Sequence, residues 1–140
     1  MNTPWIVSCN IRHFDICKHF NTNEDVIWRK IGDIREEDIV YVYLASPIKK
    51  LCYKTTVVDA QIPEPLVREM FPYALPVEEP LHGGLKFMQL HLLEDISKKG
   101  LTYQALCKAG LTQIRRQCRI SDTVMAFINL QDREEEDVNG

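Results

Sequence analysis

The sequence lacks the short motifs that mark common catalytic and metal centres. It has no GxSxG nucleophile elbow and no HExxH helix, and its glycine pair, Gly83-Gly84, has no following lysine motif of a phosphate-binding loop. No CxxC pair occurs among its five cysteines, which argues against a structural zinc site. No acid, base and nucleophile can be assembled from what remains. We therefore expect a protein that is not an enzyme and that needs no metal or cofactor.

Long apolar runs and export signals are missing as well. No run approaches the roughly 20 residues that a membrane-spanning helix needs, and the first residues, MNTPWIVSCN, lack the basic and apolar regions of a signal peptide. The cysteines are odd in number and scattered, so a disulfide framework is not expected. These features predict a cytoplasmic protein without membrane contact.

The net charge is close to zero over the body of the chain and strongly negative at its end. The 140 residues carry a net charge of −3, and the last ten, QDREEEDVNG, hold five acidic residues and one arginine. That segment accounts for −4, which leaves +1 for residues 1–130. We predict one domain over residues 1–130 and a disordered acidic tail over residues 131–140. A nearly neutral body predicts weak non-specific affinity for nucleic acid.

The stretch from Trp28 to Asp59 dominates what is present. Its β-branched and aromatic residues predict two strands, Asp38–Ala45 and Cys52–Asp59, joined by a short loop that contains Pro47. Further strands are predicted at Trp5–Cys9 and Leu85–Ile96.

Four short helices complete the expected elements: Ile11–Phe20, Leu66–Phe71, Thr102–Ala109 and Ser121–Leu130. The connections between the central strands are too short for parallel crossovers, so antiparallel pairing should dominate. The fold class that follows is α+β, with a small curved β-barrel or sheet flanked by short helices.

Trp28 is the aromatic residue whose role the sequence leaves open. Five other aromatic residues fall on predicted strands, where core packing is the usual role: Trp5, Tyr41, Tyr43, Tyr53 and Phe87. The polar segment around Trp28 continues no periodic pattern, which predicts a loop. A tryptophan on a loop beside a barrel mouth can either pack into the core or stack on a planar ligand such as a nucleobase.

Several segments together resemble the EVE-type branch of the PUA-like superfamily. They are the first strand WIVSCN, the segment FDICKHF, IWRK, the block IGDIREEDIVYVYLASPIKKLCYKTTVVD, and then KFMQLHLL, LTYQALCKAGL and RRQCRISDTVMAFI. The resemblance covers most of residues 4–130. EVE-type modules are similar in build to YTH domains, which hold a methylated adenine in an aromatic cage. In bacteria, related modules often precede a nuclease domain in modification-dependent restriction systems.

The resemblance implies roles for particular residues. Trp28 matches the cage tryptophan, and the predicted base pocket is completed by Ser8, Cys9, Asn10, Tyr43, Ser46 and Pro47. The predicted phosphate contacts are Arg29, Lys30, Lys49, Lys50, Lys54, Arg115 and Arg116. Arg29 stands where many relatives have a small residue, so the preferred base stays open.

The implied function is a reader module that binds a modified base flipped out of DNA into an aromatic pocket, in a restriction or defence context. The candidate bases are 5-methylcytosine, 5-hydroxymethylcytosine and N6-methyladenine. Modified DNA is the preferred partner, RNA is the alternative from the same fold class, and a nuclease domain or partner would do any cutting. A protein-interaction domain whose acidic tail meets a basic partner is the alternative from another class.

Overall fold

Six strands form one mixed sheet in a computed structural model that describes residues 3–74, 86–114 and 117–139. The strands are β1 (Pro4–Cys9), β2 (Asp25–Arg29), β3 (Ile39–Leu44), β4 (Lys50–Pro63), β5 (Lys86–Asp95) and β6 (Gln117–Arg119). They lie in the order β2-β5-β4-β3-β1-β6. β1 and β3 run parallel, and the other four neighbouring pairs run antiparallel, as the short connections predict.

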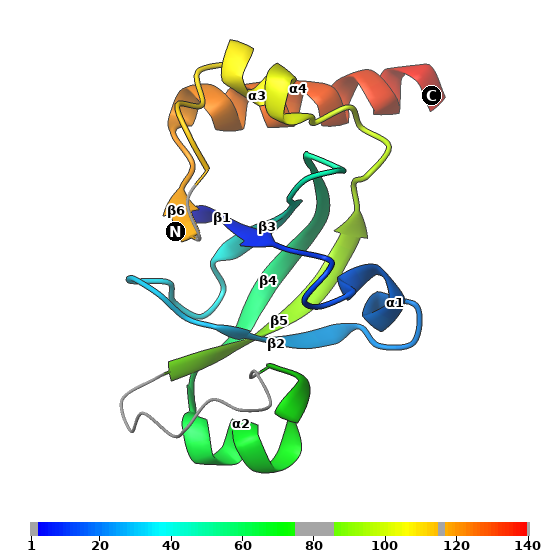
Figure 1. Cartoon of the computed structure of the whole chain (residues 1–140). Helices are drawn as coiled ribbons and strands as arrows, with labels where there is room; N and C mark the ends of the chain where they lie inside the picture. Colours follow the sequence, from blue (N-terminus) through cyan, green and yellow to red (C-terminus); the bar gives the residue numbers. More distant parts are fainter. Residues whose placement is uncertain (1–2, 75–85, 115–116, 140) are drawn as a thin grey trace.

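The helices lie at the two ends of the sheet and to one side of it. They are α1 (Ile16–Phe20), α2 (Glu64–Met70), the 3-10 helix η1 (Pro72–Ala74), α3 (Tyr103–Lys108) and α4 (Asp122–Asn139). Figure 1 shows α3 and α4 together across one end of the strongly curved sheet and α2 below the other end. The predicted α+β class with a small curved, mainly antiparallel sheet is confirmed.

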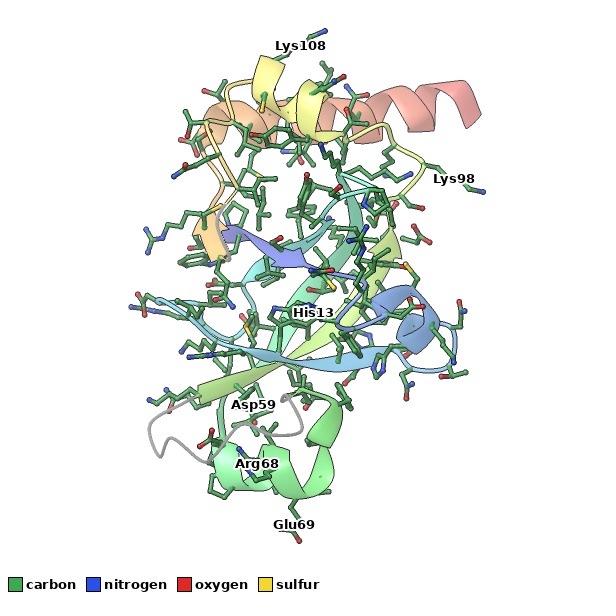
Figure 2. The ribbon with its side chains drawn as sticks, viewed as in Figure 1. His13, Asp59, Arg68, Glu69, Lys98 and Lys108 are labelled. Carbon is green, nitrogen blue, oxygen red and sulfur yellow. The ribbon has the colours of Figure 1, made fainter. Side chains whose placement is uncertain are left out.

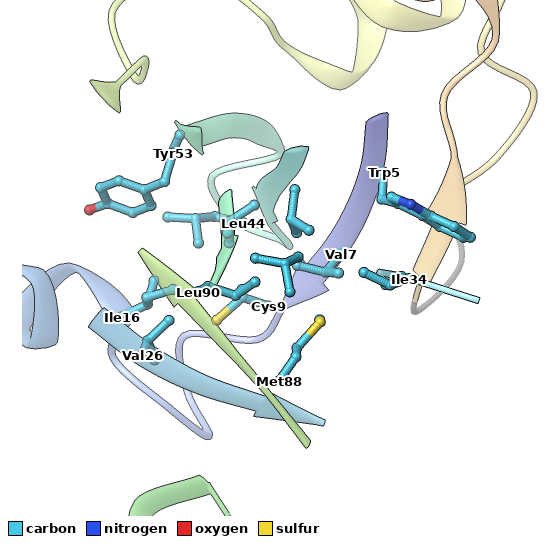
Figure 3. Close-up of a cluster of buried hydrophobic side chains, with 14 of the residues drawn as sticks. Trp5, Val7, Cys9, Ile16, Val26, Ile34, Leu44, Tyr53, Met88 and Leu90 are labelled. Atoms are coloured by element: carbon cyan, nitrogen blue, oxygen red, sulfur yellow. The ribbon is translucent and has the colours of Figure 1, made fainter. Parts of the chain in front are cut away.

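The largest hydrophobic cluster fills the inside of the curved sheet. Side chains from β1, β2, β3, β4 and β5 meet there, together with Ile16 of α1 and Ile34 of the turn before β3. Figure 3 shows Val7, Val26 and Leu90 pointing toward this centre from three different strands. A strand buries one face every second residue, so this interior takes the alternate residues of each strand.

Two smaller clusters occupy the outer face of the sheet. The first lies beneath α3 and α4 and joins Tyr41 and Tyr43 of β3 to Leu106 and Ile128 of those helices. The second lies beneath α2 and joins Ile27 of β2 to Val67. Strands β2 and β3 are therefore covered on both faces, which explains why their sequences show little alternation of polar and apolar residues.

Asp38 fixes the turn that leads into β3. Its carboxylate, 5% exposed, accepts hydrogen bonds from the indole N–H of Trp5 at 3.0 Å, from the Arg35 N–H at 2.9 Å and from the Thr3 N–H at 3.0 Å. Gly32 allows the same turn its positive φ of 80°. The aspartate at the start of the DIVYVY block is therefore a structural residue.

The segment around Trp28 forms a strand, which corrects the predicted loop. β2 pairs with β5 in register Trp28↔Met88. Its five residues are too few to display a period, and Val26 and Ile27 are both buried because the interior and α2 cover opposite faces of the strand. The two-sided burial removed the alternation that identifies an edge strand.

The helices differ from the predictions mainly in length. α1 begins at Ile16 instead of Ile11, because Asp15 caps it by accepting the Lys18 N–H at 3.1 Å. Thr102 caps α3 as its position predicted. α4 continues to Asn139, where the sequence predicts a disordered tail from residue 131. Glutamate and arginine are good helix formers, so the helical backbone can continue past its packed part.

The curved sheet stops short of a closed barrel. No ladder joins the edge strands β2 and β6 within the described residues. Instead, the side-chain amide of Gln117 on β6 donates to the Arg29 carbonyl, and its Oε1 accepts the Ile31 N–H at 2.7 Å. One side chain thus bridges the seam between the two edges. No helix among the described residues is long and apolar enough to span a membrane.

Candidate functional site

An apolar cavity opens beside the edge strand β2. It has a volume of about 170 Å³ and is lined by Phe14, Ile27, Trp28, Arg29, Tyr73 and Ala74. Three separate segments supply this lining: the turn before α1, the second half of β2, and η1. The half-buried Trp28 packs against the inner core on one side and borders the cavity on the other.

Aromatic rings form the walls of the cavity. The rings of Phe14 and Tyr73 are stacked, with centroids 5.6 Å apart and 14° between their planes. Trp28 meets Phe14 edge to face at 6.1 Å. The ring of His19 on α1 packs against two of these rings, with its centroid 5.0 Å from that of Tyr73 and 5.5 Å from that of Phe14. These contacts hold three rings around one concavity, an arrangement suited to a planar ligand.

The hydrogen bonds of β2 show which backbone groups face the cavity. The Leu92 N–H donates to the Glu24 carbonyl at 2.7 Å, and the Lys30 N–H donates to the Lys86 carbonyl at 2.9 Å. The backbone N–H and C=O groups of the even-numbered residues in this segment thus point toward β5. Because consecutive peptide groups in a strand alternate in direction, the groups of residues 25, 27 and 29 face the free edge.

Side chains satisfy part of that free edge. His19 Nε2 donates to the Asp25 carbonyl at 2.7 Å, and the Tyr73 hydroxyl accepts the Ile27 N–H at 3.0 Å. Burial raises the pKa of the Tyr73 phenol, which keeps this hydroxyl protonated. Tyr73 is therefore both a wall of the cavity and an anchor for the strand that carries Trp28.

Two backbone groups on the free edge of β2 remain beside the cavity. Among the described residues, the Ile27 carbonyl and the Arg29 N–H have no protein partner, and both residues line the cavity. Small-molecule sites typically combine apolar walls with a few such polar groups. The cavity thus offers one acceptor and one donor on either side of Trp28.

Charged groups of both signs lie near the cavity: Asp15, exposed beside Phe14, accepts the Lys18 N–H at 3.1 Å. Arg29 is exposed at the edge of the cavity, and Arg12 is exposed in the turn that carries Phe14. The carboxylate of Asp25, the acidic residue of β2, is instead engaged by His91 at 2.6 Å and by Gln89, both on β5. An anionic ligand group at the cavity edge would meet guanidinium groups.

The predicted strand-end residues Ser8, Cys9 and Asn10 do not line this cavity. Cys9 is 2% exposed in the inner core, and burial raises the pKa of its thiol to about 12. Asn10 is exposed, but its side chain accepts the Arg12 N–H at 3.0 Å in a local turn. The same turn, in which the Phe14 N–H donates to the Asn10 carbonyl at 3.1 Å, carries Phe14 to the cavity.

Tyr43 lies on the other face of the sheet from Trp28. It is 7% exposed in the cluster beneath α3 and α4, where its ring lies 6.3 Å from that of Tyr103. Its place is fixed by strand alternation, since Val42 and Leu44 take the inner face. Ser46 and Pro47 are exposed in the β3–β4 turn and do not line the cavity.

The predicted phosphate-binding residues divide into separate groups. Lys49 and Lys50 lie beside α3: the Tyr103 N–H donates to the Lys49 carbonyl at 2.9 Å, and Lys50 forms a bridge with Thr102. Lys54 follows on β4, opposite Glu94 of β5. Figure 1 places this α3 end away from α2 and the cavity-lining η1. In Figure 2, Lys98 and Lys108 project into solvent at the same end.

Arg29 and Lys30 are the predicted phosphate-binding residues that the structure brings to Trp28. Arg29 borders the cavity, and Lys30 lines a separate polar concavity of about 430 Å³ that also holds Arg35 and the acidic Asp33 and Glu36. Arg115 and Arg116 lie outside the described residues. Of the predicted phosphate-binding residues that the structure describes, Arg29 therefore borders the cavity itself.

Phe14 and Tyr73 are the wall residues that the sequence did not identify. Phe14 sits in the predicted first helix, where an aromatic residue is most often core. Tyr73 stands alone between prolines, and an aromatic residue in a segment without a period is the signal that could have marked it. Phe14 reaches Trp28, and Tyr73 reaches Ile27, through contacts distant in sequence. No cluster of potential metal ligands occurs in the part of the chain that the structure describes.

Solved structures share this fold with the chain. A hypothetical protein from Leishmania major aligns over 97% of this chain and 98% of its own, with a TM-score of 0.66 and 15% identity. The ASCH protein of Zymomonas mobilis aligns over 91% and 94%, with a TM-score of 0.63 and 12% identity. Human THYN1, solved in complex with DNA that contains 5-methylcytosine, aligns over 93% and 98%, with a TM-score of 0.58 and 10% identity.

These likenesses bear out the predicted PUA-like fold, while the EVE-type branch stays a prediction. No protein-family model matches the sequence, and no curated protein shows significant sequence similarity to it.

Proposed function

We propose that this protein is a nucleic-acid reader that holds one modified base, flipped out of DNA, in the cavity beside Trp28. The observation that carries the proposal is the aromatic wall of Trp28, Phe14 and Tyr73 around a concavity bordered by Arg29. Support also comes from the fold shared with human THYN1, whose structure holds DNA containing 5-methylcytosine.

The size of the cavity favours a single-ring base. An apolar cavity of roughly 150 Å³ takes up one benzene ring, and this cavity has a volume of about 170 Å³. We therefore expect 5-methylcytosine or 5-hydroxymethylcytosine to fit better than the two rings of N6-methyladenine. Stacking contributes about 1–3 kcal/mol per base, which offsets part of the few kcal/mol that base extrusion costs.

Polar and charged groups at the cavity would supply the remaining free energy that base extrusion costs. The Ile27 carbonyl and the Arg29 N–H are placed to contact the polar edge of the base. Arg29 and Lys30 would meet the flanking phosphates, which position the nucleic acid without reading its sequence. Binding should weaken with salt, as phosphate contacts release counterions.

The proposed role is binding without catalysis. None of the residues assigned to the cavity acts as a nucleophile or a general base, so any cleavage would come from a nuclease domain or partner. That is the arrangement expected in a modification-dependent restriction system, the context that we propose for this protein.

The test is a titration of labelled DNA duplexes that carry 5-methylcytosine, 5-hydroxymethylcytosine, N6-methyladenine or no modification. We expect the two modified cytosines to bind most tightly. Equal affinity for all four duplexes would exclude the reader. Matching RNA duplexes and single strands belong in the same series, because a general preference for RNA would favour the alternative role. Co-purification of a stoichiometric basic protein, without any nucleic-acid binding, would favour a protein-interaction domain.

Trp28→Ala tests the assigned stacking role. The loss of stacking predicts a decrease of roughly 5- to 150-fold in affinity for the preferred duplex, with non-specific binding nearly unchanged. Leu93→Ala is the matched control, since Leu93 is a half-exposed apolar residue on β5 outside the cavity. Unchanged affinity in a folded Trp28→Ala protein would show that the ring is only structural.

A further inference from the structure

We infer that Gln117 is a positioning residue for Trp28: its side-chain amide closes the seam of the sheet and sets the place of β2, on which the cavity depends. This inference deepens the proposed function and rests on it. Gln117 belongs to β6, at the far edge of the sheet from β2 in strand order, and does not line the cavity.

The contacts of Gln117 copy those of a neighbouring strand. Its Nε2 donates to the Arg29 carbonyl, and its Oε1 accepts the Ile31 N–H at 2.7 Å. These two backbone groups lie on successive free-edge residues of the β2 segment. A strand added to this edge would pair with the same two groups. The partners also fix the orientation of the amide, because a carbonyl can only accept and an N–H can only donate.

The contacts bracket the cavity-lining part of β2. Tyr73 anchors the Ile27 N–H on one side of Trp28, and Gln117 anchors the Arg29 carbonyl on the other. The backbone on each side of the tryptophan is thus held by a side chain from outside the β2–β5 ladder. Without Gln117, the end of β2 beyond Trp28 would keep only its pairing with β5.

Glutamine is suited to this place because it is both donor and acceptor. Glutamate has nearly the same shape but only accepts, so it would retain the contact with the Ile31 N–H and place a carboxylate oxygen against the Arg29 carbonyl. Alanine would remove both contacts. The conservative change therefore tests the hydrogen-bond pattern, and the alanine change tests the whole bridge.

The experiment compares the full-length wild type with Gln117→Ala and Gln117→Glu. Gln104→Glu on the exposed face of α3 is the control for the added charge. Amide hydrogen exchange at Ile31, measured without ligand, should accelerate roughly 5-fold in Gln117→Ala, the effect of about one net hydrogen bond, and less in Gln117→Glu. Unchanged exchange at Ile31 would overturn the bridge itself.

The second readout is the ratio of affinities for 5-methylcytosine duplex and unmodified duplex. We expect this ratio to decrease roughly 5-fold or more in both Gln117 variants and to be unaffected in Gln104→Glu. Affinity for unmodified DNA should be unchanged in Gln117→Ala. Faster exchange with an unchanged ratio would overturn the positioning role. A wild type that shows no preference would instead refute the proposed function, while faster exchange at Ile31 would still support the bridge.

Discussion

Asp38 connects three parts of the chain through one buried carboxylate. The indole N–H of Trp5 and the backbone N–H groups of Thr3 and Arg35 all donate to it. Buried donors that lose their acceptor pay the full cost of desolvation. The stability of β1, of the turn before β3 and of β3 itself should therefore depend on Asp38.

Asp38→Ala is expected to lower the free energy of unfolding by about 3 kcal/mol or more, because three donors lose a charged acceptor. Urea denaturation followed by circular dichroism measures the change. Asp33→Ala is the control, since its ion pair with Arg35 is exposed and should matter little. A similar, small effect for both variants would refute the structural role of Asp38.

The buried thiol of Cys9 should make the stability of the fold decrease at alkaline pH. Burial raises the pKa of its thiol from the ordinary 9.0 to about 12. In the unfolded chain the thiol loses its proton first, so stability is fully present below pH 9 and is lost between pH 9 and about 12. Cys9→Ala should destabilise the protein near neutral pH, yet lose stability less steeply above pH 9. Urea titrations at several pH values measure both slopes, and parallel slopes would contradict the prediction.

At the scale of the element, prediction from sequence succeeded where one segment determines its own structure. β3 and β4 follow from dense runs of β-branched and aromatic residues, and the Thr102 cap marks α3. β2 was missed because its two-sided burial depends on α2, a distant element. Trp28 was recognised as a candidate by type and resemblance. Tyr43 was misplaced because the face it occupies depends on the register of β3, which the sequence does not show.

Tyr73→Phe separates the two tasks of Tyr73 at the β2 edge. The variant keeps the ring against Phe14 but removes the acceptor of the Ile27 N–H. Amide hydrogen exchange at Ile27 should accelerate roughly 5-fold, the effect of one net hydrogen bond. Affinity for a modified duplex should decrease far less than in Trp28→Ala. Tyr103→Phe on α3 is the matched control and should leave exchange at Ile27 unchanged.

At the scale of the whole molecule, charge divides the chain into two unequal parts. Residues 131–140 carry a net charge of −4, and residues 1–130 carry a net charge of +1. The end of α4 should therefore repel an anionic partner. Long-range repulsion of this kind is strong at low salt and is screened within about 10 Å at 0.1 M ionic strength.

Removal of residues 131–140 is expected to raise affinity for DNA by roughly 2- to 10-fold at low salt, and the gain should vanish at about 0.5 M salt. The packed residues of α4, Val124 and Ile128, remain in the shortened chain, so its stability should change little. Fluorescence anisotropy at several salt concentrations measures the effect. A salt-independent gain would show that the segment blocks DNA by direct contact instead of by charge.

The position of β1 between β3 and β6 has a consequence for the order of assembly during synthesis. The strand made first needs one neighbour from the middle of the chain and another from residues 117–119. Until that late segment emerges from the ribosome, the outer edge of β1 stays unpaired and the cluster under α4 stays uncovered. A nascent chain that folds before residues 117–119 emerge would carry an open sheet, the state in which strand edges are most prone to aggregation.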